Sequence, residues 1–257
     1  MNRHLKRIIA VGAVAMLSAT ACDSRPNPTT SITVYAASSL IKSFTAIGKD
    51  FEAAYPGYSV EFIFATSSDL SGALAGGDVA DVFASGDRAN MAVVANAGAV
   101  SGVAVPFASN RLVVVTPAGN PRHLASFADL AKPGLRVTVC GVRGACGSAT
   151  QMVEDRTGIQ LHSESDDTTP THVLKDVTSG NADAGVVFMT DALASGDNVS
   201  WFALPSDADA ATSWITVIKG TDREQEATQF IEDVTGVRGQ QILAADGFIA
   251  PLKGPVR

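Results

Sequence analysis

Two short stretches decide the fold, Ala36-Ala37-Ser38-Ser39-Leu40 and Phe64-Ala65-Thr66-Ser67-Ser68-Asp69-Leu70. Each follows an apolar, strand-like run and opens a stretch with the apolar spacing of a helix. For the second helix, Ser67 or Ser68 is the expected N-cap. The unpaired N–H groups and the helix dipole both favour negative charge at a helix N-terminus. The sequence therefore predicts two anion-binding turns at strand–helix junctions.

Strand and helix patterns alternate outward from these turns. The predicted strands cover residues 32–35, 58–64, 80–85, 111–116, 136–140, 184–188 and 214–219. The predicted helices cover residues 40–51, 67–74, 91–97, 126–131, 147–155, 170–179 and 222–245, the last with breaks at Gly236 and Gly239. This order predicts an α/β protein with parallel sheet and flanking helices. We expect two lobes, residues 32–110 with 214–257 and residues 111–213.

The N-terminus has the pattern of an export signal. Basic residues precede a short apolar run, and small residues precede Cys22. We expect residues 1–21 to be a signal peptide, Cys22 to be the lipidated first residue of the mature chain, and residues 22–31 to be a flexible tether. An ordinary signal peptide followed by a chance cysteine is the alternative. The expected location is the outer face of the cell membrane.

The charge balance limits the classes of ligand. The formal net charge is -7, and removing residues 1–21, with Arg3, Lys6 and Arg7 and no acid, takes it to -10. An acidic chain without a basic cluster is a poor nucleic-acid binder. Long-range attraction would also work against an anion, so affinity for one must come from local, oriented donors.

The remaining cysteines lie close together, in Cys140-Gly-Val-Arg-Gly-Ala-Cys146. In an exported protein this spacing favours a disulfide that clamps the loop, although free thiols remain an alternative. The histidines fall in no spacing typical of metal ligands, so a metal site is disfavoured.

Several motifs together resemble one protein family. They are Val-Tyr-Ala-Ala-Ser-Ser-Leu (residues 34–40), Phe-Ala-Thr-Ser-Ser-Asp-Leu (64–70), Ala-Asp-Val-Phe-Ala-Ser (80–85), Ala-Asp-Ala-Gly-Val-Val-Phe (182–188) and Asp-Gly-Phe (246–248). In this order they resemble the molybdate-binding proteins of bacterial ABC importers. The resemblance implies a type II periplasmic-binding fold, in which crossover strands join two α/β lobes that close on a tetrahedral oxyanion. It implies molybdate, and also tungstate, as cargo, a membrane permease as partner, a monomer, and no cofactor.

The resemblance also implies the ligand contacts. The two serine side chains that hold the oxyanion map to Ser39 and Ser67, which would touch the metal only through molybdate oxygens. Backbone donors map to Cys146 and to the helix start at Pro170, and a tyrosine hydroxyl maps to Phe188. Two of these positions depart from the family, because proline has no N–H and phenylalanine has no hydroxyl.

Other residues can supply the missing donors. We expect Thr171, by its N–H or hydroxyl, or Thr169 or a water molecule to replace them. Asp81 is expected to brace a neighbouring loop, Arg143 to be solvated, and His172 to lie on the surface.

Three alternative functions remain open. Sulfate or another tetrahedral oxyanion could be the ligand. A serine hydrolase is disfavoured, because the chain has no Gly-x-Ser-x-Gly elbow, no paired acids and no metal motif. A cell-surface adhesion or structural lipoprotein would bind no saturable ligand.

Overall fold

The computed structural model describes residues 30–161, 166, 168–204 and 210–251. The predicted signal peptide, Cys22 and residues 22–29 of the predicted tether lie outside these residues. The tether prediction was wrong for Thr30 and Ser31, which pair in the sheet as the start of a strand. Within the described ranges, no helix combines the length and the apolar character needed to cross a bilayer.

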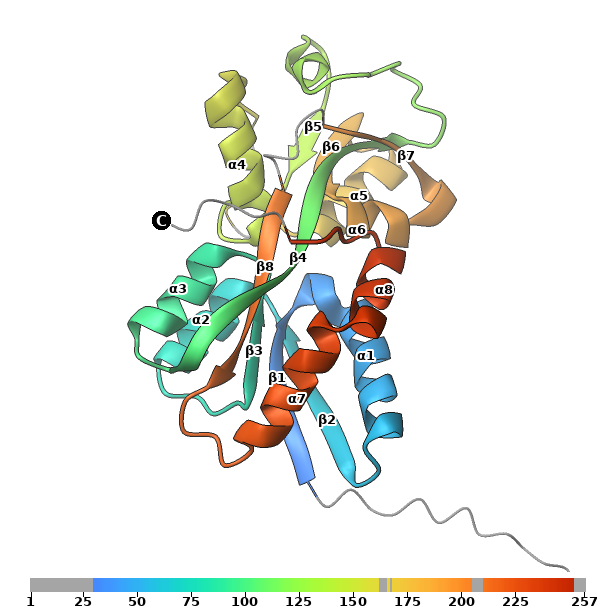
Figure 1. The fold of residues 1–257 in the computed structure, drawn as a ribbon. Coiled ribbons are helices and arrows are strands. Elements are labelled where there is room, and N and C mark those ends of the chain that lie inside the picture. The colour runs from blue at the N-terminus through green and yellow to red at the C-terminus, as the bar shows by residue number, and fades with distance from the viewer. Residues whose placement is uncertain (1–29, 162–165, 167, 205–209, 252–257) are drawn as a thin grey trace, which may run out of the picture.

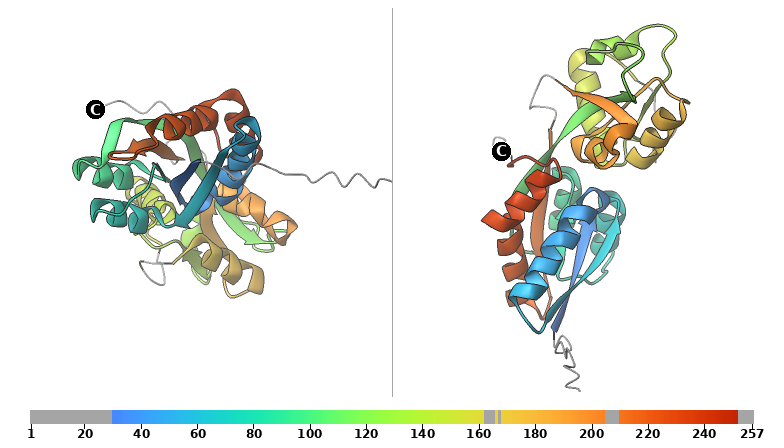
Figure 2. Two further views of the ribbon diagram at one scale, coloured as in Figure 1. Left: turned by 90° about the horizontal axis from the view of Figure 1, so that it is seen from below. Right: turned by 90° about the vertical axis from the view of Figure 1, so that its right-hand side faces the viewer.

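The described residues form two α/β lobes joined by two long strands, β4 (Val100–Pro117) and β8 (Ala210–Ile218), which run side by side between the lobes (Figure 1). The strand order is β2-β1-β3-β8-β4-β6-β5, with β7 paired to β4. A view from the side shows the lobes as separate bodies along the long axis of the molecule (Figure 2). The α/β fold class is confirmed, and β4 and β8 are its crossover strands.

Lobe 1 contains the N-terminal and C-terminal parts of the described chain. Its elements are β1 (Thr30–Ala37), the 3₁₀ turn η1 (Ser38–Leu40), α1 (Ile41–Ala54), β2 (Tyr58–Ala65), α2 (Ser67–Ala75), β3 (Val82–Ser85), α3 (Arg88–Asn96), α7 (Glu224–Thr235) and α8 (Val237–Ala245). Strand β1 lies between β2 and β3 and is parallel to both. The carboxyl ends of the three strands therefore meet at one edge, where ligands commonly bind in α/β proteins.

Lobe 2 contains the middle of the chain. Its elements are η2 (Phe127–Ala131), β5 (Val137–Val139), α4 (Ala145–Thr157), α5 (Pro170–Ser179), β6 (Ala184–Phe188), α6 (Met189–Ala194), η3 (Gly196–Asn198) and β7 (Val199–Ala203). Strands β5 and β6 are parallel, whereas β4 is antiparallel to β6 and β7. The sheet is therefore mixed rather than wholly parallel, because each crossover strand enters a lobe against the direction of its neighbour.

The apolar core is divided between the lobes. One cluster of buried side chains fills lobe 2, and two clusters cover the two faces of the lobe 1 sheet. Phe44 and Phe51 of α1 each pack against Phe230 of α7, with ring centroids 6.0 and 5.6 Å apart. Aromatic side chains bury large areas, so these contacts bind the C-terminal helices firmly to the N-terminal half of lobe 1.

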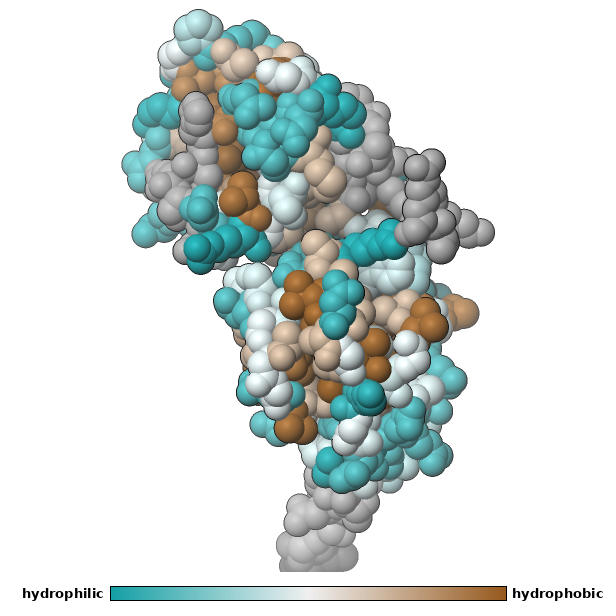
Figure 3. Space-filling model, turned by 90° about the vertical axis from the view of Figure 1, so that its left-hand side faces the viewer, coloured by the Kyte–Doolittle hydropathy of each residue, from teal (hydrophilic) through white to brown (hydrophobic). Residues whose placement is uncertain are grey.

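The space-filling view shows where the lobes meet. The molecule narrows between them, and apolar and polar side chains are mixed over the face of lobe 1 (Figure 3). Strands β4 and β8 run between the lobes across this narrow part of the molecule (Figure 1).

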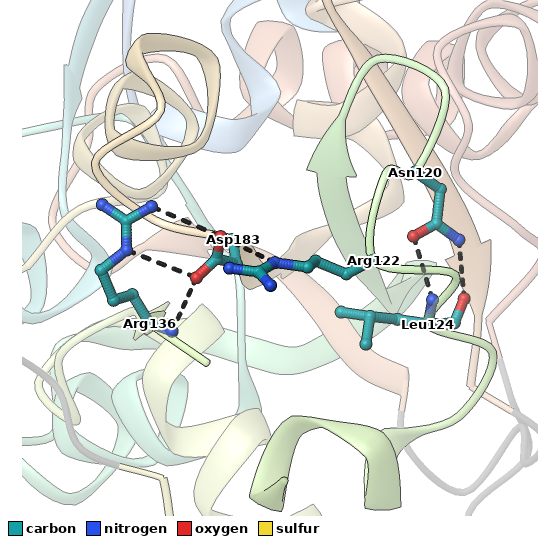
Figure 4. A network of polar contacts seen from close by, with 5 residues as sticks. All are labelled: Asn120, Arg122, Leu124, Arg136 and Asp183. Atoms are coloured by element: carbon teal, nitrogen blue, oxygen red, sulfur yellow. Dashed lines mark hydrogen bonds and ion pairs between the residues drawn. The ribbon is translucent and has the colours of Figure 1, made fainter. Parts of the chain in front are cut away.

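A polar network stabilises the far end of lobe 2. The Asp183 carboxylate accepts hydrogen bonds from Arg136, including its backbone N–H at 3.0 Å, and from Arg122 Nε at 3.3 Å (Figure 4). These donors, the Arg136 backbone first, hold the pKa of Asp183 below its ordinary value. In the same loop Asn120 binds both the N–H and the carbonyl of Leu124. The network fixes the long connection after β4.

Asp81 has a similar bracing role in lobe 1. Its carboxylate accepts a hydrogen bond from the Thr33 N–H at 2.7 Å and another from the Thr221 hydroxyl. The prediction that Asp81 braces a neighbouring loop is confirmed.

Several local predictions were wrong or incomplete. Strand β7 and helix α6 were not predicted. The break at Gly236 is confirmed, but Gly239 lies inside α8. A methyl group on Gly239 would lie 2.2 Å from the Asp233 carbonyl oxygen, so this glycine permits a close turn between α7 and α8.

Candidate functional site

Ser67 is held at the start of α2 in lobe 1. It is the first residue of the helix, its side chain is buried, and its Oγ accepts a hydrogen bond from the Gly86 N–H at 2.9 Å. The hydroxyl hydrogen of Ser67 is thereby left to donate to a second acceptor. The expected N-cap was wrong: Thr66 caps α2 by accepting from the Asp69 N–H. Because Thr66 caps the helix, the Ser67 hydroxyl is not needed for capping.

Ser39 lies in the middle of η1, between the end of β1 and the start of α1. Its side chain is half-buried and makes no hydrogen bond to any other residue that the structure describes. A serine at a strand–helix junction without an internal partner is free to bind a ligand.

Gly86 marks the meeting point of both lobes. A methyl group on Gly86 would lie 3.4 Å from Ser67 Oγ, 3.6 Å from Ala37 Cβ of β1, and 3.4 Å from Ala145 Cβ, the first residue of α4 in lobe 2. The two serine-rich turns and the N-terminus of α4 therefore approach one another around a residue without a side chain. Gly86 was not predicted, although its place after the third parallel strand, in Ser85-Gly86-Asp87, was a usable signal.

In lobe 2 the loop before α4 folds back on the first turn of that helix. The sulfur atoms of Cys140 and Cys146 lie 2.10 Å apart, at disulfide distance. A methyl group on Gly147 would lie 1.9 Å from the Gly141 carbonyl oxygen, so only glycine fits there. The cysteine pair and Gly147 together fix the N-terminus of α4.

The start of α5 lies beside this loop. The Gly141 N–H donates to the Thr168 carbonyl at 2.8 Å. Pro170 is the first residue of α5, and the Thr169 hydroxyl caps the helix by accepting from the His172 N–H at 3.2 Å. Thr171 is exposed and has a backbone N–H to offer in the same turn.

The first turns of these three helices carry spare donors. The following backbone N–H groups have no acceptor among the described residues: Ser67 and Ser68 in α2, Ala145, Cys146 and Gly147 in α4, and Thr171 in α5. Oriented N–H groups at helix N-termini bind anions without any basic side chain. These local donors can bind an anion even though the negative net charge of the chain repels it at long range.

Phe188 ends β6 and is buried in the lobe 2 core. Two residues further along the chain, Thr190 Oγ1 of α6 accepts a hydrogen bond of 2.9 Å from Asn110 Nδ2 of β4. Asp191 Oδ2 is buried and has no hydrogen-bond partner among the described residues. Burial raises the pKa of Asp191 to about 6, although a backbone hydrogen bond from Phe188 opposes the rise.

The other polar residues considered from the sequence lie at the surface. Arg143 is exposed, and its backbone N–H donates to the Asp166 carbonyl. His172 is exposed, and its Nε2 lies 3.2 Å from Asp176 Oδ2. In the part of the chain that the structure describes, no three His, Cys, Asp or Glu side chains form a group that could hold a metal ion.

Comparison with known proteins gives three findings. The family model described as bacterial extracellular solute-binding protein matches residues 32–249. The molybdate-binding protein ModA of Mycobacterium tuberculosis is 44% identical over 248 residues, which cover 95% of each chain. The ModA protein of Mycobacterium bovis matches equally well. These relatives confirm the resemblance found in the sequence.

Solved structures confirm the fold. The periplasmic molybdate-binding protein of Azotobacter vinelandii superposes with a TM-score of 0.72 at 19% identity and covers 86% of this chain and 100% of its own. The sulfate-binding protein SubI of Mycobacterium tuberculosis gives a TM-score of 0.74 at 21% identity, with 87% and 88% covered. At these sequence identities the two structures show a shared fold but do not establish a shared function. This chain belongs to the family of bacterial extracellular solute-binding proteins.

Proposed function

We propose that this protein binds molybdate between its lobes and delivers it to the membrane permease of an ABC importer. The observation that carries the proposal is the meeting of the Ser67 hydroxyl and the α4 N-terminus from opposite lobes around Gly86. The 44% identity to ModA over nearly the whole chain supports molybdate as the oxyanion. Tungstate has the same charge and tetrahedral shape, so we expect it to bind as well.

The proposed contacts come from both lobes. Ser39 and Ser67 donate their hydroxyl hydrogens from lobe 1. The backbone N–H of Cys146 donates from lobe 2, held by a disulfide between Cys140 and Cys146. Molybdenum itself touches no protein atom.

The departures at Pro170 and Phe188 are compensated locally. Thr171 follows Pro170 in the first turn of α5 and supplies the N–H that proline lacks. Phe188 is buried in the core and contributes shape rather than a hydrogen bond. Each hydrogen bond to a charged group contributes about 1.5–3 kcal/mol, so one lost hydroxyl weakens binding without abolishing it.

The whole protein is proposed to be an exported lipoprotein with two lobes. Residues 1–21 are a signal peptide, and the lipidated Cys22 anchors a monomer to the outer face of the membrane through a tether that ends where β1 begins at Thr30. The lobes comprise residues 32–110 with 214–257 and residues 111–213. The protein catalyses no reaction and needs no cofactor, since the oxyanion is its cargo.

A calorimetric titration tests this function. The mature protein, stripped of anions by unfolding and refolding, is titrated with molybdate, tungstate, sulfate and phosphate. We expect one-to-one binding of molybdate and tungstate at least about a hundredfold tighter than that of sulfate, a gap of nearly 3 kcal/mol. Preference for sulfate or phosphate would assign a different oxyanion, and binding of none would overturn the proposal.

A further inference from the structure

The segment after α8, residues 246–249, contacts both lobes, and we call it the strap. It leaves the end of α8, passes α6 and crosses β4 (Figure 1). Unlike β4 and β8, it contributes only one isolated bridge to the sheet. Its side chains and backbone meet three elements that belong to different parts of the molecule.

The lobe 1 end of the strap is Asp246. Its Oδ2 accepts a hydrogen bond from Ser43 Oγ at 2.6 Å, and its Oδ1 lies 2.5 Å from Lys42 Nζ. Lys42 and Ser43 are in the first turn of α1, directly after η1 with Ser39. The Asp246 side chain is only 11% exposed and Ser43 is buried, so their hydrogen bond is shielded from solvent, whereas the Lys42 side chain is exposed. Asp246 thus holds the first turn of α1, which directly follows the turn that carries Ser39.

The lobe 2 end is Gly247, which packs against α6. A methyl group on Gly247 would lie 2.6 Å from Leu193 Cδ1, 3.5 Å from Met189 Cγ and 3.7 Å from Thr190 Cα. The φ angle of Gly247 is +97°, a conformation that favours glycine. A side chain here would have to displace the exposed Leu193 side chain or α6 itself, so glycine lets the strap lie close to lobe 2.

The strap is fixed between these two ends. Phe248 is buried in the lobe 1 core, and its N–H donates to the Leu243 carbonyl. Ile249 and Ser109 of β4 exchange two backbone hydrogen bonds, of 2.8 and 2.9 Å, where β4 passes between the lobes. A displacement of α6 relative to the strap is therefore opposed at the crossover.

We propose that Asp246 and Gly247 are positioning residues for oxyanion binding. Asp246 holds Ser39 through the first turn of α1, and Gly247 sets how closely α6 and the rest of lobe 2 approach lobe 1. The two residues are adjacent, so placement of a lobe 1 donor and closure of lobe 2 are coupled through one short segment. This inference rests on the proposed function.

The test is Gly247→Ala, with Gly220→Ala as its matched control. Gly220 also has a positive φ, +90°, but a methyl group there would meet no atom within 4 Å. The control therefore carries the backbone strain without the contact to α6. We expect Gly220→Ala to bind molybdate within about twofold of the wild type, and Gly247→Ala to bind at least about tenfold more weakly.

Two further variants separate positioning from general damage. Leu193→Ala in the Gly247→Ala protein removes the atom nearest to the new methyl group, so it should restore most of the lost affinity. Asp246→Asn keeps the size of the side chain but removes its charge, and it should weaken molybdate binding severalfold. X-ray scattering, with and without molybdate, should show a larger radius of gyration for Gly247→Ala than for Gly220→Ala.

Equal losses in Gly247→Ala and Gly220→Ala, or a loss that Leu193→Ala does not relieve, would overturn the role of Gly247. Should Gly247→Ala fail to fold, unchanged binding by Asp246→Asn would overturn the role of the strap. Failure of the proposed function is distinguishable, because it appears in the wild-type titration before any variant is compared.

Discussion

Lobe 1 and lobe 2 present different kinds of donor to the proposed oxyanion. Lobe 1 offers two side-chain hydroxyls, Ser39 and Ser67, at the ends of parallel strands, besides the N–H groups in the first turn of α2. Lobe 2 offers backbone N–H groups in the first turns of α4 and α5. A hydroxyl is removed by changing one residue, whereas a backbone donor remains whichever residue carries it, unless that residue is proline. The lobes should therefore respond to mutation in different ways.

The comparison also shows what holds each half in place. In lobe 1 the hydrogen bond from Gly86 orients the Ser67 hydroxyl. In lobe 2 the donors are backbone groups, and their position depends on the shape of the loop, on the cysteine pair, on Gly147 and on the Thr169 cap of α5. We expect lobe 2 to be sensitive to loop geometry and insensitive to side-chain chemistry.

The largest effect is expected from Gly147→Ala. Its methyl group would lie 1.9 Å from the Gly141 carbonyl oxygen and must displace the loop or the helix start. This displacement moves the Cys146 N–H and the spare N–H of Gly147 beside it away from the oxyanion, and at about 1.5–3 kcal/mol for each bond it predicts molybdate binding about a hundredfold weaker or worse. Calorimetry measures the loss, and Gly72→Ala is the control because a methyl group there meets nothing within 4 Å. Equal affinities of the two variants would contradict the backbone role of lobe 2.

Single serine substitutions should have the next largest effect. Ser39→Ala and Ser67→Ala each remove one hydrogen bond to the oxyanion, worth about 1.5–3 kcal/mol, so each should weaken binding about ten- to a hundredfold. Ser38→Ala, at the exposed neighbour of Ser39, should leave the affinity unchanged. If Ser38→Ala proves as damaging as Ser39→Ala, the turn matters and the Ser39 hydroxyl does not.

Loss of the cysteine clamp should have a smaller effect on binding. A disulfide closing a loop this short contributes about 2 kcal/mol to the free energy of unfolding. Reduction, or Cys140→Ser, should therefore lower the melting temperature and weaken molybdate binding severalfold, because the Cys146 N–H survives in a looser loop. Thermal unfolding and titration with and without a reductant measure both effects. A reductant should leave Cys140→Ser unchanged, and an unchanged wild type would mean that the loop needs no clamp.

The smallest effect on binding is expected from Asp191→Asn, which acts on stability instead. Burial raises the pKa of Asp191 from 3.8 to about 6, so the folded protein binds the proton more tightly than the unfolded chain. The Asp191 contribution is therefore lost as pH rises from about 4 to above 6, by up to about 3 kcal/mol. The variant should gain stability over the wild type at pH 7.5 and little at pH 4. Equal melting temperatures at pH 7.5 would show that the buried carboxylate is stabilised by other groups.

Some parts of the fold and of the candidate site could be predicted from the sequence, and others could not. The serine-rich turns, the strand over residues 184–188 and the helix Pro170–Ser179 were all predicted, because hydroxyls, β-branched runs and a proline at the first helical turn leave local signals. Gly86, the strap and strand β7 were not predicted. The place of Gly86 after a parallel strand and the Asp-Gly-Phe motif of residues 246–248 are local signals, but which residues of the other lobe they approach depends on distant contacts that a local pattern does not encode.

The most direct test of a shared oxyanion site is a crystal structure of the molybdate complex with data collected at the molybdenum absorption edge. We expect one anomalous peak between the lobes, with oxyanion oxygens within hydrogen-bond distance of Ser39 Oγ, Ser67 Oγ and the Cys146 N–H. A peak held by one lobe alone, or located away from these three groups, would contradict the account.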